Sequence, residues 1–147
     1  MGQKVNPVGF RIGVNKKWES NWYSDEKAPE YVAEDHEIRQ LIGERYRGAG
    51  IAEVSIERPR DDRISMIIVS ARPGIIIGKG GNEINKFQQE LSDKTDRNVN
   101  ISVKEAQDPH LQAQLIAQEV AFQIENRIPP SRAMKEVISR SMNKGAK

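Results

Sequence analysis

The 147 residues suffice for one ordinary domain, or for a small domain with part of a second, and 37% apolar with 30% charged residues fits a globular protein with a modest core. Zero cysteines exclude disulfides, thiolate zinc sites and cysteine nucleophiles, and two histidines, His36 and His110, are too few for a histidine-based metal or catalytic cluster. No apolar run approaches the roughly 20 residues that span a bilayer, and we expect no secretory signal, metal or cofactor.

The net charge of +2 hides an uneven distribution along the chain. Residues 1–17 contain four basic residues and no acid, residues 19–44 contain eight acids against two bases, and residues 127–147 contain six bases against one acid. The two basic ends indicate a polyanion partner. Runs of like charge are as often solvated surface, which is the interpretation we give to the acids between Glu19 and Glu44.

The first 28 residues show no sustained periodicity and are predicted to be an irregular basic arm. Its aromatic residues, Trp18, Trp22 and Tyr23, could stack on bases. An arm also needs apolar anchors in order to dock, so we expect these three side chains to pack against the protein.

From about Pro29 the apolar spacing becomes helical, until Gly48 and Gly50 end the helix. Alternation over residues 52–57 predicts a strand with one solvated face, followed by a turn over 58–62. Residues 64–71 are apolar on both faces, which predicts a better-buried strand.

A glycine turn at 78–81 precedes a helix from Asn82 and a third strand over 99–104. Asp108 is a candidate N-cap, with Pro109 at the first position of a helix through about 127. Pro129 and Pro130 separate this helix from a last one over about 131–143. The order predicts an α+β fold in which one three-stranded sheet has helices on a single face.

The turn Gly78-Lys79-Gly80-Gly81 has the GxxG pattern of the KH-domain loop, which clamps about four nucleotides by their backbone. Glycine is needed because a phosphate chain must pass close to the main chain, where a Cβ would block it. The N–H groups of the following helix and Lys79 supply positive charge. GxxG alone is a weak signal, but here an apolar run precedes it, an amphipathic helix follows, and a strand lies on each side.

The residue spacing around the glycine turn does not fit either of two other phosphate-binding loops. A Walker A loop needs four residues between its glycines and then Lys-Ser/Thr, whereas Gly74 and Gly78 are separated by three, and Gly80 follows Lys79. A dinucleotide-binding GxGxxG starting at Gly78 would need glycine where Glu83 stands. The sequence therefore argues against a nucleotide-hydrolysing enzyme.

The last predicted helix has a basic side and an apolar side. At about 100° per residue, Arg132, Lys135 and Arg140 fall within one arc with Glu136 among them, opposite an apolar set of Met134, Val137, Ile138 and Met142. Such a stripe on an anchored helix suits phosphate contact, and an ordinary amphipathic surface helix is the alternative.

Seven segments in order along the chain together resemble a family of KH-domain ribosomal proteins, the third protein of the bacterial small subunit. These segments are residues 1–7 (MGQKVNP), 9–13 (GFRIG), 56–59 (IERP), 71–74 (ARPG), 77–81 (IGKGG), 132–135 (RAMK) and 143–147 (NKGAK). The chain departs from the family pattern at Asn6, where histidine is usual, and at Ser131, where a basic residue is common.

The resemblance implies a type II KH fold, no enzymatic activity, and a place on the head of the small subunit bound to ribosomal RNA. It also implies that the last helix lines the entry path of messenger RNA, with Arg132, Lys135 and Arg140 as candidate contacts and one charge missing at Ser131. Partners would be ribosomal RNA, messenger RNA and neighbouring small-subunit proteins, without a membrane, on a cytoplasmic ribosome or alternatively an organellar one. Candidate RNA contacts elsewhere are Gly78, Lys79, Gly80, Gly81, Arg72, Lys4, Arg11, Lys16 and Lys17.

We divide the chain into an arm over 1–28, a KH domain over 29–106 and the helical start of a second α/β domain over 107–147. In the resembled family, strands after the last helix complete that second domain, so we expect the chain to be part of a longer product, with an apolar surface on its two last helices. The alternative function is a free-standing KH protein that acts as an RNA chaperone or ribosome assembly factor.

Overall fold

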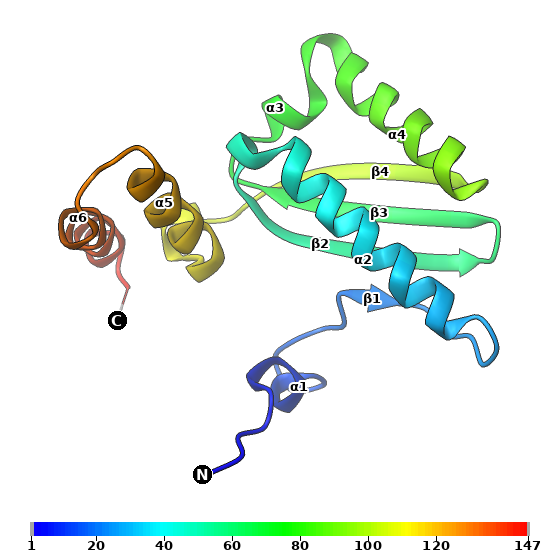
Figure 1. Ribbon diagram of the computed structural model, residues 1–147, viewed down its shortest axis with the longest axis horizontal. Helices are drawn as coiled ribbons and strands as arrows, with labels where there is room; N and C mark the ends of the chain where they lie inside the picture. Colours follow the sequence, from blue (N-terminus) through cyan, green and yellow to red (C-terminus); the bar gives the residue numbers. More distant parts are fainter. Residues whose placement is uncertain (1, 147) are drawn as a thin grey trace.

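The computed structural model describes residues 2–146 (Figure 1). Ten helices and strands follow one another, with short 3-10 turns at Arg47–Ala49, Lys79–Gly81 and Pro109–Leu111. In chain order they are α1 (Pro7–Arg11), β1 (Ser20–Asn21), α2 (Ala28–Arg45), β2 (Ile51–Arg60), β3 (Arg63–Ser70), α3 (Pro73–Ile77), α4 (Asn82–Thr95), β4 (Asn98–Glu105), α5 (Ala113–Glu125) and α6 (Pro130–Asn143).

One sheet with the strand order β1-β2-β3-β4 organises the first two thirds of the chain. β2 and β3 form an antiparallel hairpin, and β4 lies parallel to β3 along its whole length. The α+β class and the predicted helices on one face are confirmed. The sheet has one strand more than predicted, because Ser20 and Asn21 pair in parallel with Ile56 and Glu57 at the edge.

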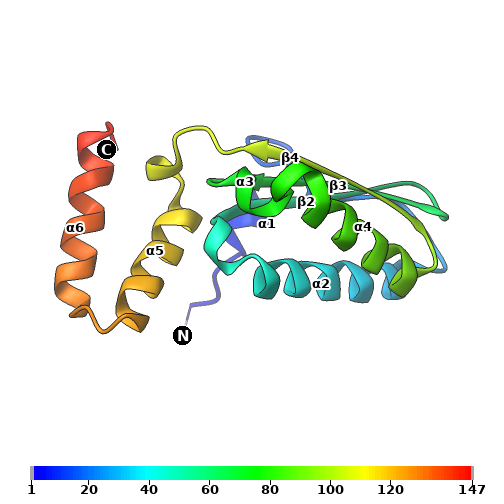
Figure 2. The same ribbon diagram turned by 90° about the horizontal axis from the view of Figure 1, so that it is seen from above.

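The hydrophobic core lies between the sheet and the three helices α2, α3 and α4, which cover the same face (Figure 2). One cross-strand row shows the arrangement: Ile56, Met66 and Ile101 face one another across β2, β3 and β4, and all three are buried. Side chains at every second position of β3 are fully buried on this side and only half-buried on the other. β3 is thus better buried than β2, as predicted.

The N-terminal arm is more regular than its sequence predicted. Asn6 caps the short helix α1 by accepting hydrogen bonds from the N–H groups of Val8 and Gly9 at 2.9 and 3.2 Å. Together with β1, this helix contradicts the prediction of an irregular arm. The signal was missed because a five-residue helix is too short to show periodicity.

Helices α5 and α6 form an antiparallel pair beside the sheet (Figures 1 and 2). Ala133 and Val137 are buried between them, while Met134, Ile138 and Met142 form an exposed apolar stripe along α6. The predicted helix start at Pro109 is wrong. Asp108 has a positive φ of 44°, caps nothing with its side chain, and opens only a 3-10 turn, so that α5 begins at Ala113.

We expect residues 107–147 to be less protected in hydrogen exchange than residues 50–105 in a monomeric sample. In α5 and α6 only a narrow strip of each helix is buried, whereas the sheet and its helices share one continuous core. The measurement is amide exchange by mass spectrometry on the full chain. Equal protection of the two segments would contradict this expectation.

Candidate nucleic-acid interface

The glycine turn joins α3 to α4 at the end of the helical layer near β3's last residues. Gly78, Gly80 and Gly81 all have positive φ, of 70°, 64° and 80°. An L side chain rarely adopts this conformation, so the sharp reversal between the two helices depends on glycine. Two glycines of the loop differ in the space around them: a Cβ on Gly78 would lie 2.6 Å from Cγ of Glu83, whereas a Cβ on Gly80 would meet nothing within 4 Å. Gly80 therefore leaves bare main chain open to a ligand.

Positive charge gathers where the loop meets α4. No side chain caps α4, although the N–H of its first residue, Asn82, donates to the carbonyl oxygen of Lys79. The positive end of the helix dipole and the exposed ammonium of Lys79 therefore lie together at the loop. Glu83 in the first turn contributes one opposing charge. The loop can thus receive one stretch of phosphate backbone through main-chain N–H groups and one lysine.

Apolar side chains flank the loop on α3. Ile76 is fully buried and anchors the short helix to the core, while Ile75 and Ile77 on its other side are exposed. These exposed isoleucines beside the loop offer an apolar surface against which flat rings can pack. Arg72 lies one short helix away, at the start of α3, and its guanidinium reaches toward the carbonyl oxygen of Gly48 at 3.5 Å.

The basic residues predicted in the arm lie apart from this loop. Lys4, Arg11, Lys16 and Lys17 are exposed around α1, beyond the β1 edge of the sheet, whereas the loop lies on the far side of α2 (Figure 1). The structure therefore brings the four loop residues together, leaves Arg72 at the opposite end of α3, and does not join the arm to them.

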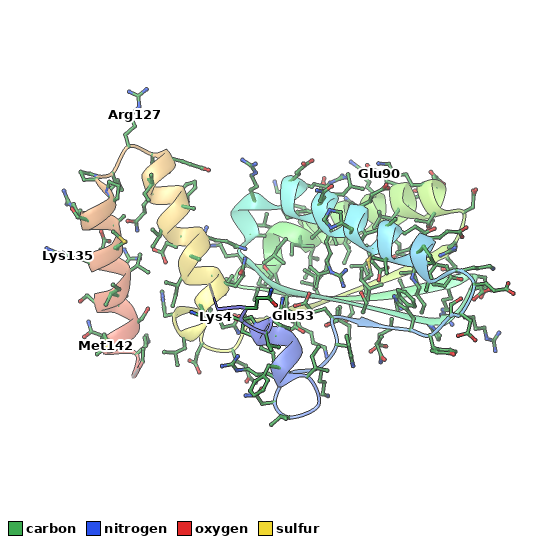
Figure 3. All side chains as sticks on the ribbon, turned by 60° about the horizontal axis from the view of Figure 1, so that its bottom comes forward. Lys4, Glu53, Glu90, Arg127, Lys135 and Met142 are labelled. Atoms are coloured by element: carbon green, nitrogen blue, oxygen red, sulfur yellow. The ribbon has the colours of Figure 1, made fainter. Side chains whose placement is uncertain are left out.

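The basic residues predicted on the last helix lie on α6, which α5 separates from the loop. Arg132 and Lys135 are exposed and line a shallow depression of about 480 Å³ with Ser131 and Glu136. Lys135 points away from α5 (Figure 3).

Arg140 differs from its two neighbours on α6. Its guanidinium pairs with Glu119 of α5 at 2.5 Å and with Glu136, and the hydrogen bond to Glu136, with the charge of Glu119, raises the pKa of Arg140. These two carboxylates offset its charge. Arg132 and Lys135 are the members of the predicted stripe that remain available to an anion.

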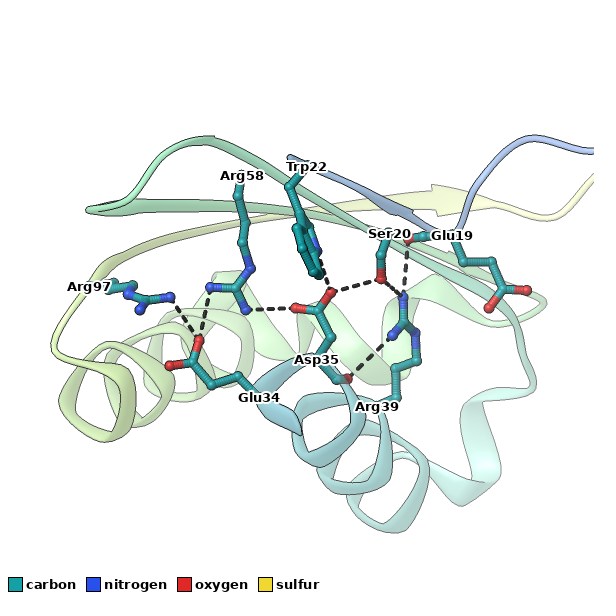
Figure 4. Close-up of polar contacts among 8 residues, drawn as sticks. All are labelled: Glu19, Ser20, Trp22, Glu34, Asp35, Arg39, Arg58 and Arg97. Atoms are coloured by element: carbon teal, nitrogen blue, oxygen red, sulfur yellow. Dashed lines mark hydrogen bonds and ion pairs between the residues drawn. The ribbon is translucent and has the colours of Figure 1, made fainter. Parts of the chain in front are cut away.

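A buried polar network that the sequence analysis missed fastens the arm to the sheet (Figure 4). The carboxylate of Asp35, with 1% of its surface exposed, accepts hydrogen bonds from Ser20 at 2.7 Å, from the indole of Trp22 at 2.8 Å and from Arg58 at 2.6 Å. Arg39 donates to Ser20 and to the carbonyl oxygen of Glu19. The network holds β1 against α2 and β2.

Glu34 extends this network by accepting from Arg58 at 2.9 Å and from Arg97 at 2.7 Å. Both guanidinium groups lie over the ring of Tyr31. The prediction of a solvated acidic face is therefore wrong for Glu34 and Asp35. Helical spacing could have revealed the exception, because Asp35 lies four residues after Tyr31 and three before Ile38 on the buried face of α2.

The aromatic residues of the arm divide into two kinds. Trp22 packs edge to face on Tyr31 with ring centroids 5.3 Å apart, which confirms the expectation of packing for this residue. Trp18 and Tyr23 are 66% and 86% exposed, so the same expectation is wrong for them.

His36 is exposed and His110 half-buried, and no group of three His, Asp or Glu within residues 2–146 is placed to hold a metal ion. Over the same residues no helix has the length and apolar character of a membrane span.

The arrangement of α2-β2-β3-α3-α4-β4, with the glycine loop between α3 and α4, defines a KH-domain protein. Residues 37–111 match the KH domain family. Across 147 residues the chain is 46% identical to the small ribosomal subunit protein uS3 of Thermosipho africanus, and across 146 residues it is 44% identical to that of Thermotoga maritima; it covers 70% of each relative. It is 44% identical to the same protein of Agathobacter rectalis over its full length, covering 67% of that relative.

The chain belongs to the uS3 family of small ribosomal subunit proteins. The resemblance seen in the sequence is thereby confirmed, and so is the expectation of a structural protein without enzymatic activity. The division into arm, KH domain and second domain stays a prediction, as do the individual contact residues.

Proposed function

We propose that this chain is a structural component of the small ribosomal subunit that binds ribosomal RNA through the loop Gly78–Gly81. The observation that carries the proposal is the exposed turn of three positive-φ glycines at an uncapped helix N-terminus, with Lys79 on it. A KH loop of this kind accepts single-stranded backbone. As part of that particle the protein would work on cytoplasmic ribosomes with ribosomal RNA and neighbouring small-subunit proteins as its partners.

We expect the full chain to sediment with small subunits at moderate salt, whereas a free-standing RNA chaperone would dissociate. Multiple contacts over a folded particle resist counterion competition better than a single KH loop does. The measurement is sedimentation of tagged chain with purified subunits through a sucrose cushion at increasing salt. Release at the same salt concentration from subunits and from a short unstructured RNA would favour the chaperone function.

The message-entry role belongs to the same proposal and rests on α6. Arg132 and Lys135 are exposed, and within residues 2–146 neither forms an ion pair with a glutamate. They lie on a helix whose buried residues Ala133 and Val137 pack against α5. Two mobile cations on a fixed helix can attract the phosphates of a passing strand and favour its unpaired form. Arg140 would contribute less, because Glu119 and Glu136 already pair with it.

Replacing Arg132 and Lys135 with alanine is expected to shallow the salt dependence of RNA affinity by a slope of about 1–2, if both touch phosphate. In a reconstituted translation system the variant should slow on structured messages more than on unstructured ones. Arg140→Ala is the comparison and should change the slope less. Equal slowing on both kinds of message would count against a role at the entry path.

A further inference from the structure

The closed end of the β2–β3 hairpin carries an irregularity with a chemical consequence. The register of the two strands shifts between Glu57 and Arg60, where β2 has one more residue than β3. Pro59 stands within this shift, as is common at bulges, because proline donates no ladder hydrogen bond. Simple alternation from the buried Ile56 would send Arg60 toward the helices. The bulge instead places it directly opposite Arg63, on the face that no helix covers.

Three polar side chains therefore form one row across the end of the sheet. Arg60 is opposite Arg63 in the hairpin, and Arg63 is opposite Asn98 in the parallel pair β3–β4. All three are exposed. With Pro59 and Asp62 they line a depression of about 510 Å³.

Two arginines opposite each other on one face repel, so the pair is unfavourable for the fold alone. Of the nearby acids, Asp61 pairs with Lys27 at 2.9 Å and Glu34 pairs with Arg58 and Arg97. Asp62 lines the same depression but forms no ion pair with either arginine. Within residues 2–146 neither Arg60 nor Arg63 has an ion-pair partner, so an external anion would relieve the repulsion.

The lining favours nucleic acid over a protein partner. Arginine forks bind phosphate with two parallel hydrogen bonds, and a protein interface centres on apolar or aromatic anchors. Pro59 is the one apolar residue among the five that line the depression. The next row inward, Glu57, Ser65 and Asn100, is also polar.

We propose that Arg60, Arg63 and Asn98 form a second RNA contact that grips the phosphate backbone of a segment different from the one at the glycine loop. The row lies at one end of β3, whereas the loop follows the other end (Figure 1). Seven steps of about 3.3 Å separate the two ends of this eight-residue strand by about 23 Å, so the roughly four nucleotides that a KH loop clamps do not also occupy the row. This inference rests on the proposed function, since it adds a site to an RNA-binding protein.

The test compares two RNAs and two double variants of the full chain. The probes are a uridine tetramer, which reports the glycine loop because it is too short to reach the row as well, and small-subunit ribosomal RNA transcribed in vitro, which can engage both contacts. Arg60→Gln with Arg63→Gln should weaken binding to ribosomal RNA by about tenfold and shallow its salt slope by about 1–2, while binding to the tetramer stays the same. The control, Lys94→Gln with Lys144→Gln, removes two exposed charges elsewhere.

A thermal melt of the free protein separates binding from folding. Loss of a repulsive pair should leave the melting temperature unchanged or raise it, whereas a lower melting temperature would assign the two arginines to the fold and overturn the proposal. If both double variants weaken ribosomal RNA equally, the row is no contact site although the glycine loop still is. If the wild-type chain binds neither RNA, the proposed function fails as well.

Discussion

Replacing Lys79 and Gly80 with aspartate should reduce the affinity of the full chain for short single-stranded RNA by about two orders of magnitude or more. A hydrogen bond to a charged group contributes about 1.5–3 kcal/mol, and the variant loses the lysine and places two carboxylates against phosphate. The measurement is fluorescence anisotropy with a labelled dodecamer. The fold should persist, since residues 79 and 80 are both exposed, a Cβ on Gly80 would meet nothing within 4 Å, and aspartate tolerates the positive φ of this position better than most residues.

Helix α4, which follows the loop, offers a control variant with the same change in net charge. Gln89→Asp with Lys94→Asp alters exposed positions of α4 by the same amount and is expected to change the affinity by no more than about threefold, because long-range effects between exposed charges are screened. If the loop variant binds like this control, the GxxG turn is not the RNA contact.

The second large effect is expected on stability. Asp35→Ala should lower the free energy of unfolding by about 3 kcal/mol, because it leaves the buried guanidinium of Arg58 with Glu34 alone. The side chains of Asp35 and Arg58 are 2% and 3% exposed, so water cannot replace the lost carboxylate. Urea unfolding followed by circular dichroism measures the change. Glu37→Ala on the exposed side of α2 is the matched control, with an expected effect below about 0.5 kcal/mol.

The same variant should release the arm from the sheet, since Ser20 and Trp22 both donate to Asp35. In a Trp18→Phe background, the fluorescence of Trp22 should shift to the red and become accessible to iodide before global unfolding. An unchanged Trp22 spectrum in a destabilised Asp35→Ala protein would show that packing on Tyr31, and not the network, holds the arm.

Local patterns determined most of the fold. The helical spacing of Tyr31, Ile38 and Ile42, the alternation in β2 and β4, and the glycine turn each report on neighbours within one element, where the period of the backbone dictates which side chains share a face. The family resemblance rests on the same local residues, and for this reason sequence alone led to the KH class and to the ribosomal family.

Tertiary structure decided what depends on partners distant in the chain. Helical spacing places Asp35 on the buried face of α2, but only the approach of Arg58 and Trp22 from other elements makes it a buried acceptor. The charge of Arg140 is offset because Glu119 on the neighbouring helix pairs with it. Arg60 reached the open face only through a bulge, whose register depends on the strand opposite. Contacts between different elements leave no repeating pattern in the sequence. They can therefore be seen only in the packed structure.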